Sequence, residues 1–204
     1  MNEKEKSLGE RYTEMALDHI SNKKYAEALE FAGNSLVQCI SKNGLTSSKT
    51  ADSHYLLGYI YLYLKEYEKC LSEMKVCRTI RRKHVYEKSL EIAMCDVNIG
   101  KSELGLKNYQ SSFHSLYISW YKRALQLGFK HHSTLESLSL LQLVRFQTVM
   151  NVSNTIGDES PLRSKSPLSP RSTSPMRSSP AHPNNANMNM NSTLLNDQWI
   201  HKYE

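Results

Sequence analysis

The sequence predicts an all-α protein, an array of helical hairpins followed by a disordered tail. Three observations lead to this prediction. All six prolines of the 204-residue chain lie between Pro161 and Pro183. Because a proline in a helix interior costs about 3 kcal/mol, the part before them can be helical throughout. Within that part a short phrase recurs at a fixed interval, and after it the composition changes to serine, proline and asparagine.

The recurring phrase is Lys-x-Tyr, which ends at Tyr25, Tyr67 and Tyr109, so that 42 residues separate successive copies. Two columns of small residues keep the same interval, nine positions before and three positions after each tyrosine. Their members are Ala16, Gly58 and Gly100 before the tyrosine, and Ala28, Cys70 and Ser112 after it. Sequence periods of 20–50 residues are typical of arrays of repeated units. A fourth copy begins at the same 42-residue interval, at Leu141 and Gln142.

Each copy has the pattern of two helices joined near the Lys-x-Tyr phrase. In the second copy, Leu57, Gly58 and Tyr61 share one face of the first helix, because residues three and four apart are neighbours on a helix. Apolar residues return at helical spacing after the phrase, from Cys70 to Cys77. We expect Gly58 to lie against Cys70, which would let the two helices approach closely. The tyrosine of the phrase is expected to cap its own hairpin.

Breaks in the helical pattern give the boundaries of the predicted helices. The phrase itself joins the two helices of a hairpin, Gly44 and the polar run after it separate the first hairpin from the second, and Gly128 ends the third. The predicted helices span residues 7–22, 25–42, 50–64, 67–82, 86–105, 109–127 and 133–150. We therefore expect a helical domain over residues 1–150, a disordered tail over 151–193 and a short apolar motif over 194–204.

The order aliphatic–small–x–x–Tyr, then Tyr, then small resembles the tetratricopeptide repeat, most closely from Tyr55 to Cys77. The usual period of that family is 34 residues, and the longer period found here is similar to the repeats of kinesin light chains. The resemblance covers residues 7–150 and implies a solenoid of about three and a half repeats. It also implies that the first helix of each hairpin lines a concave groove that binds a partner peptide. The groove residues that it implies are Tyr55, Tyr59, Leu62, Tyr63 and Lys101.

The last predicted helix, residues 133–150, has apolar residues on every side. A helix of this kind is buried, so we expect a cover from the C-terminal segment, from a second copy or from another protein. The C-terminal motif is a candidate, and it could either fold back or bind a partner. Its apolar and aromatic residues are Leu194, Leu195, Trp199, Ile200 and Tyr203.

The tail contains five Ser-Pro dipeptides, which a proline-directed kinase would phosphorylate. Those at Ser160 and Ser174 continue as Ser-Pro-x-Arg and resemble sites of cyclin-dependent kinases. The serines are Ser160, Ser166, Ser169, Ser174 and Ser179. Four basic residues and no acidic residue lie between Ser160 and Asn196. Since each phosphate adds about −1.5 to −2 charges, several phosphates would reverse the local charge.

A basic run near the middle of the chain is a second candidate for binding an acidic partner. It consists of Arg78, Arg81, Arg82 and Lys83. The formal net charge of the chain is only +6, so we do not expect nucleic acid as the main ligand.

No residues suggest catalysis, a cofactor or a metal. Gly100-Lys101-Ser102 matches the end of a phosphate-binding loop, but that pattern requires a glycine where Cys95 stands. The four cysteines form no CxxC pair. The first residues show no secretory signal, and no apolar run is long enough to cross a membrane. We therefore expect an intracellular protein without enzymatic activity, in the cytoplasm, the nucleus or both.

These features predict a non-catalytic adaptor that binds a partner peptide in its groove, with a tail that phosphorylation regulates through the cell cycle. A structural subunit of a stable complex, docking through the apolar helix 133–150 and the C-terminal motif, is the alternative. A microtubule- or nucleic-acid-binding protein that uses the basic tail is a weaker one.

Overall fold

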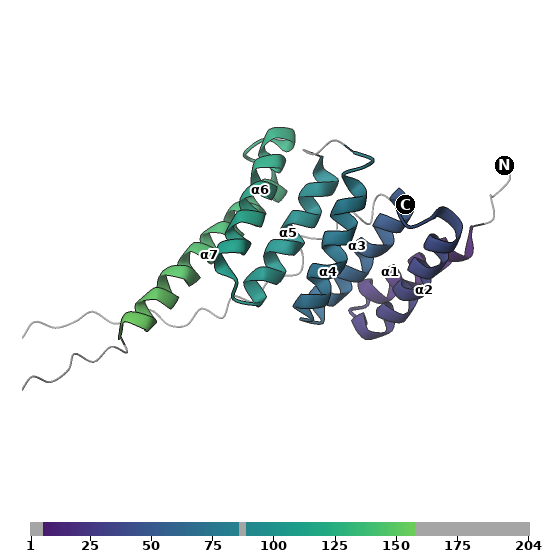
Figure 1. Cartoon of the computed structure of the whole chain (residues 1–204), viewed down its shortest axis with the longest axis horizontal. Coiled ribbons are helices and arrows are strands. Elements are labelled where there is room, and N and C mark those ends of the chain that lie inside the picture. The colour runs from purple at the N-terminus through teal and green to yellow at the C-terminus, as the bar shows by residue number, and fades with distance from the viewer. Residues whose placement is uncertain (1–5, 86–88, 158–204) are drawn as a thin grey trace, which may run out of the picture. The chain divides into compact units, whose positions relative to one another are not determined.

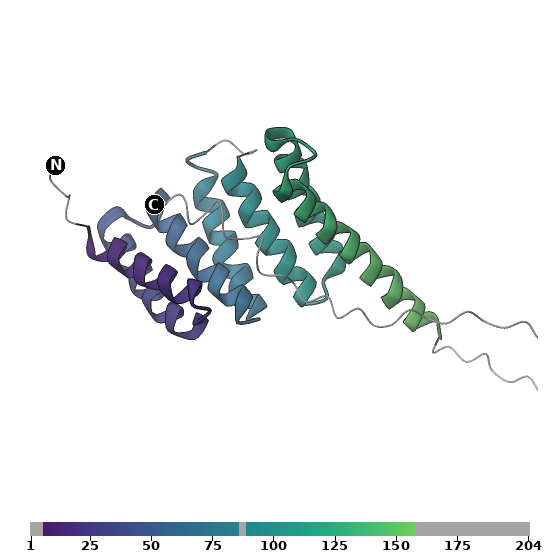
Figure 2. The same ribbon diagram turned by 180° about the vertical axis from the view of Figure 1, so that it is seen from behind.

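A computed structural model describes residues 6–85 and 89–157 of the chain, with side chains to residue 151. These residues form helices and no strand, which confirms the predicted all-α class. The helices are α1 (Leu8–Ser21), α2 (Tyr25–Asn43), α3 (Ser48–Tyr63), α4 (Tyr67–Arg81), α5 (Leu90–Gly105), α6 (Tyr109–Leu127) and α7 (His132–Gly157). Figures 1 and 2 show them following one another along a row, each beside the next in sequence.

The helices pair into three hairpins, α1–α2, α3–α4 and α5–α6, and α7 begins a fourth. Successive first helices also touch, because α3 packs on α5 and α5 on α7. The predicted boundaries are close to those observed, with two differences. The fifth helix begins at Leu90, where Ser89 caps it by accepting a hydrogen bond from the Ile92 amide. The last one continues to Gly157, past its predicted end at residue 150. No proline or glycine lies between Gly128 and Gly157 to end this helix earlier.

The Lys-x-Tyr phrase is explained by the backbone of the turn. Lys23, Lys65 and Lys107 have φ angles of 58°, 61° and 62°, in the left-handed region. In the second copy the Lys65 amide donates to the Leu62 carbonyl at 3.1 Å, and the next amide donates to the Tyr61 carbonyl at 2.9 Å. This pair of hydrogen bonds is the Schellman ending of a helix, in which glycine usually occupies the left-handed position.

The small residues allow close packing within each hairpin, although their partner is not the predicted one. A Cβ built on Gly58 would lie 2.8 Å from Met74 Cε, and one built on Gly100 would lie 2.6 Å from Leu116 Cγ. A small residue is therefore favoured where a long side chain crosses from the second helix, and Ala16 fills this column in the first hairpin. The expected contact of Gly58 was with Cys70, which precedes Met74 by one helical turn. In the third hairpin the residue equivalent to Cys70 does touch the glycine, because Ser112 Oγ donates to the Gly100 carbonyl at 2.8 Å.

The tyrosine of each phrase packs on the following hairpin rather than capping its own. Tyr25 at the start of α2 stacks on Tyr63 of α3, with ring centroids 4.7 Å apart and planes at 12°. One repeat later, a Cβ built on Gly105 of α5 would lie 2.4 Å from the Tyr67 ring. The third tyrosine, Tyr109, packs against the cluster that joins α6 to α7. The repeated tyrosine thus holds successive hairpins together.

Two buried arginines make a second set of contacts between hairpins. Arg81 at the end of α4 donates to the Glu91 carbonyl at 2.8 Å. Arg123, which lies 42 residues later on α6, donates to the Ser133 carbonyl at 2.7 Å. Both side chains are buried, and buried cations require such partners. The equivalent residue of the first repeat is Cys39, so the first joint lacks this contact.

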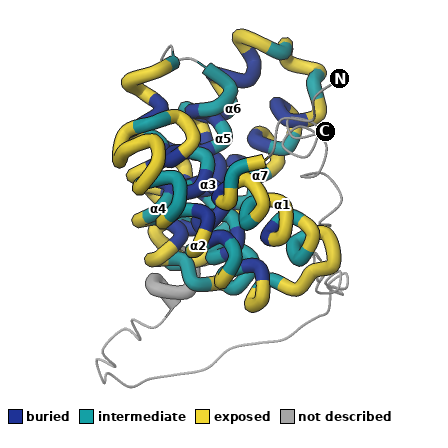
Figure 3. Tube along the Cα trace, turned by 90° about the vertical axis from the view of Figure 1, so that its right-hand side faces the viewer, coloured by how far each residue is buried: buried dark blue, intermediate teal, exposed yellow. Residues whose placement is uncertain are grey.

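Figure 3 shows buried residues along the inward sides of the helices and exposed residues on their outward sides. The last helix follows this pattern among the residues that the structure describes, so the cover expected for its other sides stays a prediction. Leu141 and Val144 pack against Leu116 of α6. Leu135 is 47% exposed and Phe146 is 59% exposed, which leaves an apolar face of α7 open to solvent.

Candidate binding surfaces

Tyr55 lies in the interior and does not line a groove. Only 5% of this residue is exposed, and its hydroxyl accepts a hydrogen bond from Asn98 Nδ2 at 3.2 Å. The Arg81 guanidinium lies over its ring, 4.9 Å from the ring centroid. Burial raises the pKa of the Tyr55 hydroxyl well above its usual range. The predicted role of Tyr55 in peptide binding is therefore wrong, because the neighbouring hairpin covers it.

Tyr59 and Tyr63 remain partly accessible on α3. The Tyr59 hydroxyl donates to the Tyr63 hydroxyl at 3.2 Å, and their ring centroids are 4.9 Å apart. Tyr25 completes the group by stacking on Tyr63, and Leu62 beside it is half-buried. Burial raises the pKa of Tyr59 far above that of a free tyrosine. We call Tyr25, Tyr59 and Tyr63 the tyrosine cluster.

Lys101, the remaining predicted groove residue, connects two helices. Its ammonium donates to Glu136 of α7 at 2.8 Å, and Arg123 of α6 donates to the same carboxylate at 3.0 Å. Burial acts to raise the pKa of Glu136, but the two cations outweigh burial and hold this pKa below its usual value. Lys101 has only 11% of its side chain exposed, so it stabilises the joint between α5 and α7.

The predicted basic patch is divided between the interior and the surface. Arg81 is 2% exposed and donates to Asp52 at 2.8 Å, so it cannot contact an acidic partner and that prediction is wrong. Arg78 donates to the buried carboxylate of Asp96 at 3.0 Å and keeps 24% of its side chain exposed. Arg82 and Lys83 are exposed.

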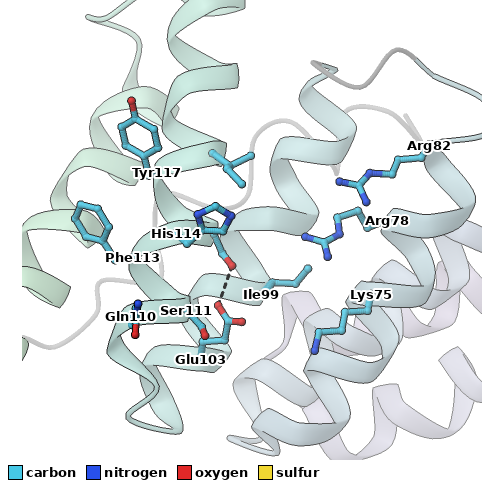
Figure 4. Close-up of a pocket in the computed structure, with 12 residues that line it drawn as sticks. Lys75, Arg78, Arg82, Ile99, Glu103, Gln110, Ser111, Phe113, His114 and Tyr117 are labelled. Atoms are coloured by element: carbon cyan, nitrogen blue, oxygen red, sulfur yellow. Dashed lines mark hydrogen bonds between the residues drawn. The ribbon is translucent and has the colours of Figure 1, made fainter.

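The structure also reveals a cleft that the sequence analysis did not identify. It has a volume of about 700 Å³ and lies between α4 and α6, with α5 behind it (Figure 4). Lys75, Arg78 and Arg82 of α4 line one side. Their spacing of three and four residues places them on one helical face, a signal that the sequence already contained.

Among the described residues, neither a metal-binding cluster nor an activated Cys70 thiol is found. No three of their histidine, cysteine and acidic side chains come together in a way that could hold a metal ion. Burial raises the pKa of Cys70 to about 11, so this thiol is a poor nucleophile. No helix in this part of the chain is long and apolar enough to cross a bilayer.

Two groups of predicted site residues lie outside the described part of the chain. They are the Ser-Pro serines at Ser160, Ser166, Ser169, Ser174 and Ser179, and the C-terminal motif residues Leu194, Leu195, Trp199, Ile200 and Tyr203.

No known family model matches the chain, and no curated protein sequence does. Solved structures do match. One is a protein of Podosopora anserina with nearly identical TPR-like repeats, named as a kinesin light chain. It has 14% sequence identity and a TM-score of 0.60, over 74% of this chain and 77% of that one. A point variant of the same protein has the same identity and TM-score, over 74% and 76%. The chain therefore has a TPR-like repeat fold, as the resemblance implied.

Proposed function

We propose that this protein is a non-catalytic adaptor that binds a peptide segment of another protein. The observation that carries this proposal is the TPR-like array itself, whose stacked hairpins present a large surface. Arrays of this kind generate extended binding surfaces from the repetition of one unit.

The tyrosine cluster is the part of the predicted groove that suits peptide binding. Tyr59 and Tyr63 are only half-buried, and the stack with Tyr25 fixes the ring of Tyr63. A tyrosine whose ring is already fixed offers a large contact area and loses little conformational entropy on binding. Tyr55 is buried and Lys101 is bound to Glu136, so neither is expected to contact the peptide.

Selection of a random peptide library on the immobilised full chain tests the adaptor role and the site together. We expect a family of related peptides to be enriched and to bind Tyr59→Ala at least about tenfold more weakly, as loss of an aromatic anchor predicts. Tyr121→Ala is the matched control, since Tyr121 is an exposed tyrosine on α6. Equal binding to both variants would refute the site, and no enrichment would refute the adaptor role.

Phosphorylation of the tail is the proposed regulation. The two Ser-Pro-x-Arg sequences, at Ser160 and Ser174, are the favoured sites, and the compartment that fits a kinase of this kind is the cytoplasm or the nucleus. Incubation of the full chain with a cyclin-dependent kinase, followed by peptide mass spectrometry, should find phosphate first at these two serines. Phosphate elsewhere alone would contradict this assignment.

A structural subunit is the second candidate function, and the open face of α7 favours it. In α5 the residues Ala93 and Asp96 are covered by α6, with 0% and 1% exposed. The equivalent residues of α7, 42 positions later, are Leu135 and Leu138, which are 47% and 37% exposed. An amphipathic helix from another subunit would cover these leucines, on the side of α7 where a complete hairpin has its second helix.

The behaviour of the isolated chain separates the two candidates. If α7 is an obligate interface, the wild-type chain expressed alone should aggregate, and Leu135→Lys/Leu138→Lys should make it soluble and monomeric in light scattering. A wild-type chain that is monomeric at high concentration would exclude the subunit role and leave the adaptor proposal intact.

A further inference from the structure

The cleft between α4 and α6 has a basic wall. Lys75 and Arg82 are exposed, and Arg78 between them uses one Nη1–H for Asp96 while its Nε–H has no acceptor among the described residues. Figure 4 shows the three side chains on α4 across the cleft from His114 of α6. Three cationic side chains on one face form a surface that attracts anions.

Cationic residues outnumber acidic ones in the lining of this cleft. The one carboxylate among the lining residues is Glu103, which accepts a hydrogen bond from Ser115 at 2.8 Å. Asp96 is buried and is already shared between Arg78 at 3.0 Å and Lys122 at 2.8 Å. The lining of the cleft therefore has three cationic residues and a single carboxylate, a composition that favours an anionic ligand.

The opposite wall offers aromatic rings and hydrogen-bonding groups. Phe113 and Tyr117 lie one turn apart on α6, with nearly parallel rings whose centroids are 6.5 Å apart, and both are nearly half exposed. Ser111 and His114 line the same side. Proline-rich segments dock on aromatic side chains of this kind. A ligand that joins an anionic group to a proline would match both walls.

We propose that this cleft binds the phosphorylated Ser-Pro segment of the protein's own chain, residues 158–180. The phosphates would contact Lys75, Arg78 and Arg82, and the prolines that follow the serines would pack on Phe113 and Tyr117. The segment carries four basic residues and two acidic ones, Asp158 and Glu159, so without phosphate its net charge is positive and does not favour the cleft. Five phosphates of about −1.5 to −2 charges each make it acidic, and binding follows.

The chain itself is the favoured source of the ligand for two reasons. It contains five Ser-Pro dipeptides, all between Ser160 and Pro180. It is also tethered, since the segment begins directly after α7 ends at Gly157, and an extended chain spans roughly 3.3 Å per residue. Binding within one molecule requires no second protein, so weaker phosphate contacts suffice than for a free peptide. This inference rests on the proposed phosphorylation of the tail, because the segment is expected to bind only when it carries phosphate.

Fluorescent synthetic peptides of residues 158–180 test the proposal on the unphosphorylated full chain, by fluorescence anisotropy. One peptide carries phosphate on all five serines, one carries none, and a third of unrelated sequence has glutamates and the same net charge as the first. We expect binding of the phosphopeptide alone, with an affinity that falls as salt is added. Equal binding of the glutamate peptide would overturn the assignment to phosphoserine and indicate a general acidic ligand.

Matched charge variants locate the site. Lys75→Gln/Arg82→Gln should weaken phosphopeptide binding about tenfold, because charge-assisted contacts are lost. Lys42→Gln/Lys130→Gln removes the same charge from two exposed residues outside the lining and should leave it unchanged. Circular dichroism checks that both variants remain helical. Equal affinities of the two variants would show that the phosphopeptide does not bind in this cleft.

A second measurement examines the tethered segment. The full chain, phosphorylated by a cyclin-dependent kinase, should show slower hydrogen exchange in α4 and α6 than the unphosphorylated chain, and Lys75→Gln/Arg82→Gln should abolish the difference. Protection of α3 instead would overturn the proposal. Tyr59→Ala should change neither experiment, so failure of this inference and failure of the adaptor proposal are distinguishable.

Discussion

The ring of Tyr67 lies directly on the backbone of Gly105, in the next hairpin. A Cβ added to Gly105 would approach three atoms of this ring to between 2.4 and 2.6 Å. At the preceding joint the same tyrosine column meets a different residue, because Tyr25 stacks on Tyr63 there. One repeated tyrosine thus joins successive hairpins through two kinds of contact.

The Tyr67–Gly105 contact predicts that Gly105→Ala destabilises the protein. The methyl group cannot be accommodated unless the ring moves, and overpacking of this kind costs about 1–3 kcal/mol. Urea denaturation followed by circular dichroism measures the change in the free energy of unfolding. Gly33→Ala is the control, because a Cβ there meets nothing within 4 Å and alanine stabilises a helix interior by about 0.5–1 kcal/mol. The prediction fails if both variants change stability in the same direction.

The left-handed conformation of the turn lysines predicts that glycine at these positions increases the stability of the protein. Lys65 has a φ of 61°, a conformation that costs a side-chain-bearing residue about 1–2 kcal/mol. Since glycine has more freedom to lose on folding, we expect Lys65→Gly to stabilise the protein by about 0.5–1 kcal/mol. Lys69→Gly, inside α4, should destabilise it by about 1 kcal/mol. Thermal unfolding of the two variants gives the comparison, and a lower midpoint for Lys65→Gly would contradict the prediction.

Glu136 should make the free energy of unfolding depend on pH in the acidic range. Its pKa is lower in the folded protein than its usual value of 4.5, because Lys101 and Arg123 outweigh the effect of burial. Its contribution is therefore complete above about pH 4.5 and is lost as the pH falls through the lower, folded pKa. Glu136→Gln should flatten the decline of unfolding free energy in this acidic window. A decline as steep as that of the wild type would show that other carboxylates cause it.

The cysteines should differ in their reaction with thiol reagents. Cys70 and Cys77 are buried, and burial raises the pKa of both thiols. Cys39 is only partly buried. Titration with a chromogenic disulfide should label one thiol rapidly in the native protein and all of them after denaturation. Cys39→Ser should remove the fast phase, and rapid labelling of Cys70 in that variant would contradict the structure.

The sequence allowed the hairpins to be predicted because their cause is local. Tyr25, Tyr67 and Tyr109 mark the same turn in each repeat, and helix-forming residues lie on both sides of it. The contacts between hairpins could not be predicted in the same way. A residue's own spacing does not show that Tyr67 reaches Gly105, because that contact depends on how one hairpin rests on the next.

The same limit explains the errors in the predicted site. Tyr55 and Arg81 have the spacing of surface residues, yet they lie together in the interior, where Asp52 compensates the charge of the arginine. One signal of this burial was present in the sequence. Arg81 and Arg123 occupy the same column of the repeat, and a charged residue that recurs with the period of the fold is expected to have a repeated structural partner.

Gln142 restricts how another helix can pack on α7. It occupies the column of Ala16, Gly58 and Gly100, at which the long side chains of a second helix leave room for little or no side chain. Its amide side chain blocks the addition of another hairpin of the same geometry after α7. Lengthening of this protein by duplication of its coding sequence would therefore succeed upstream of α7. Any helix that packs on the open side of α7 must cross it at a different angle from that within the three hairpins.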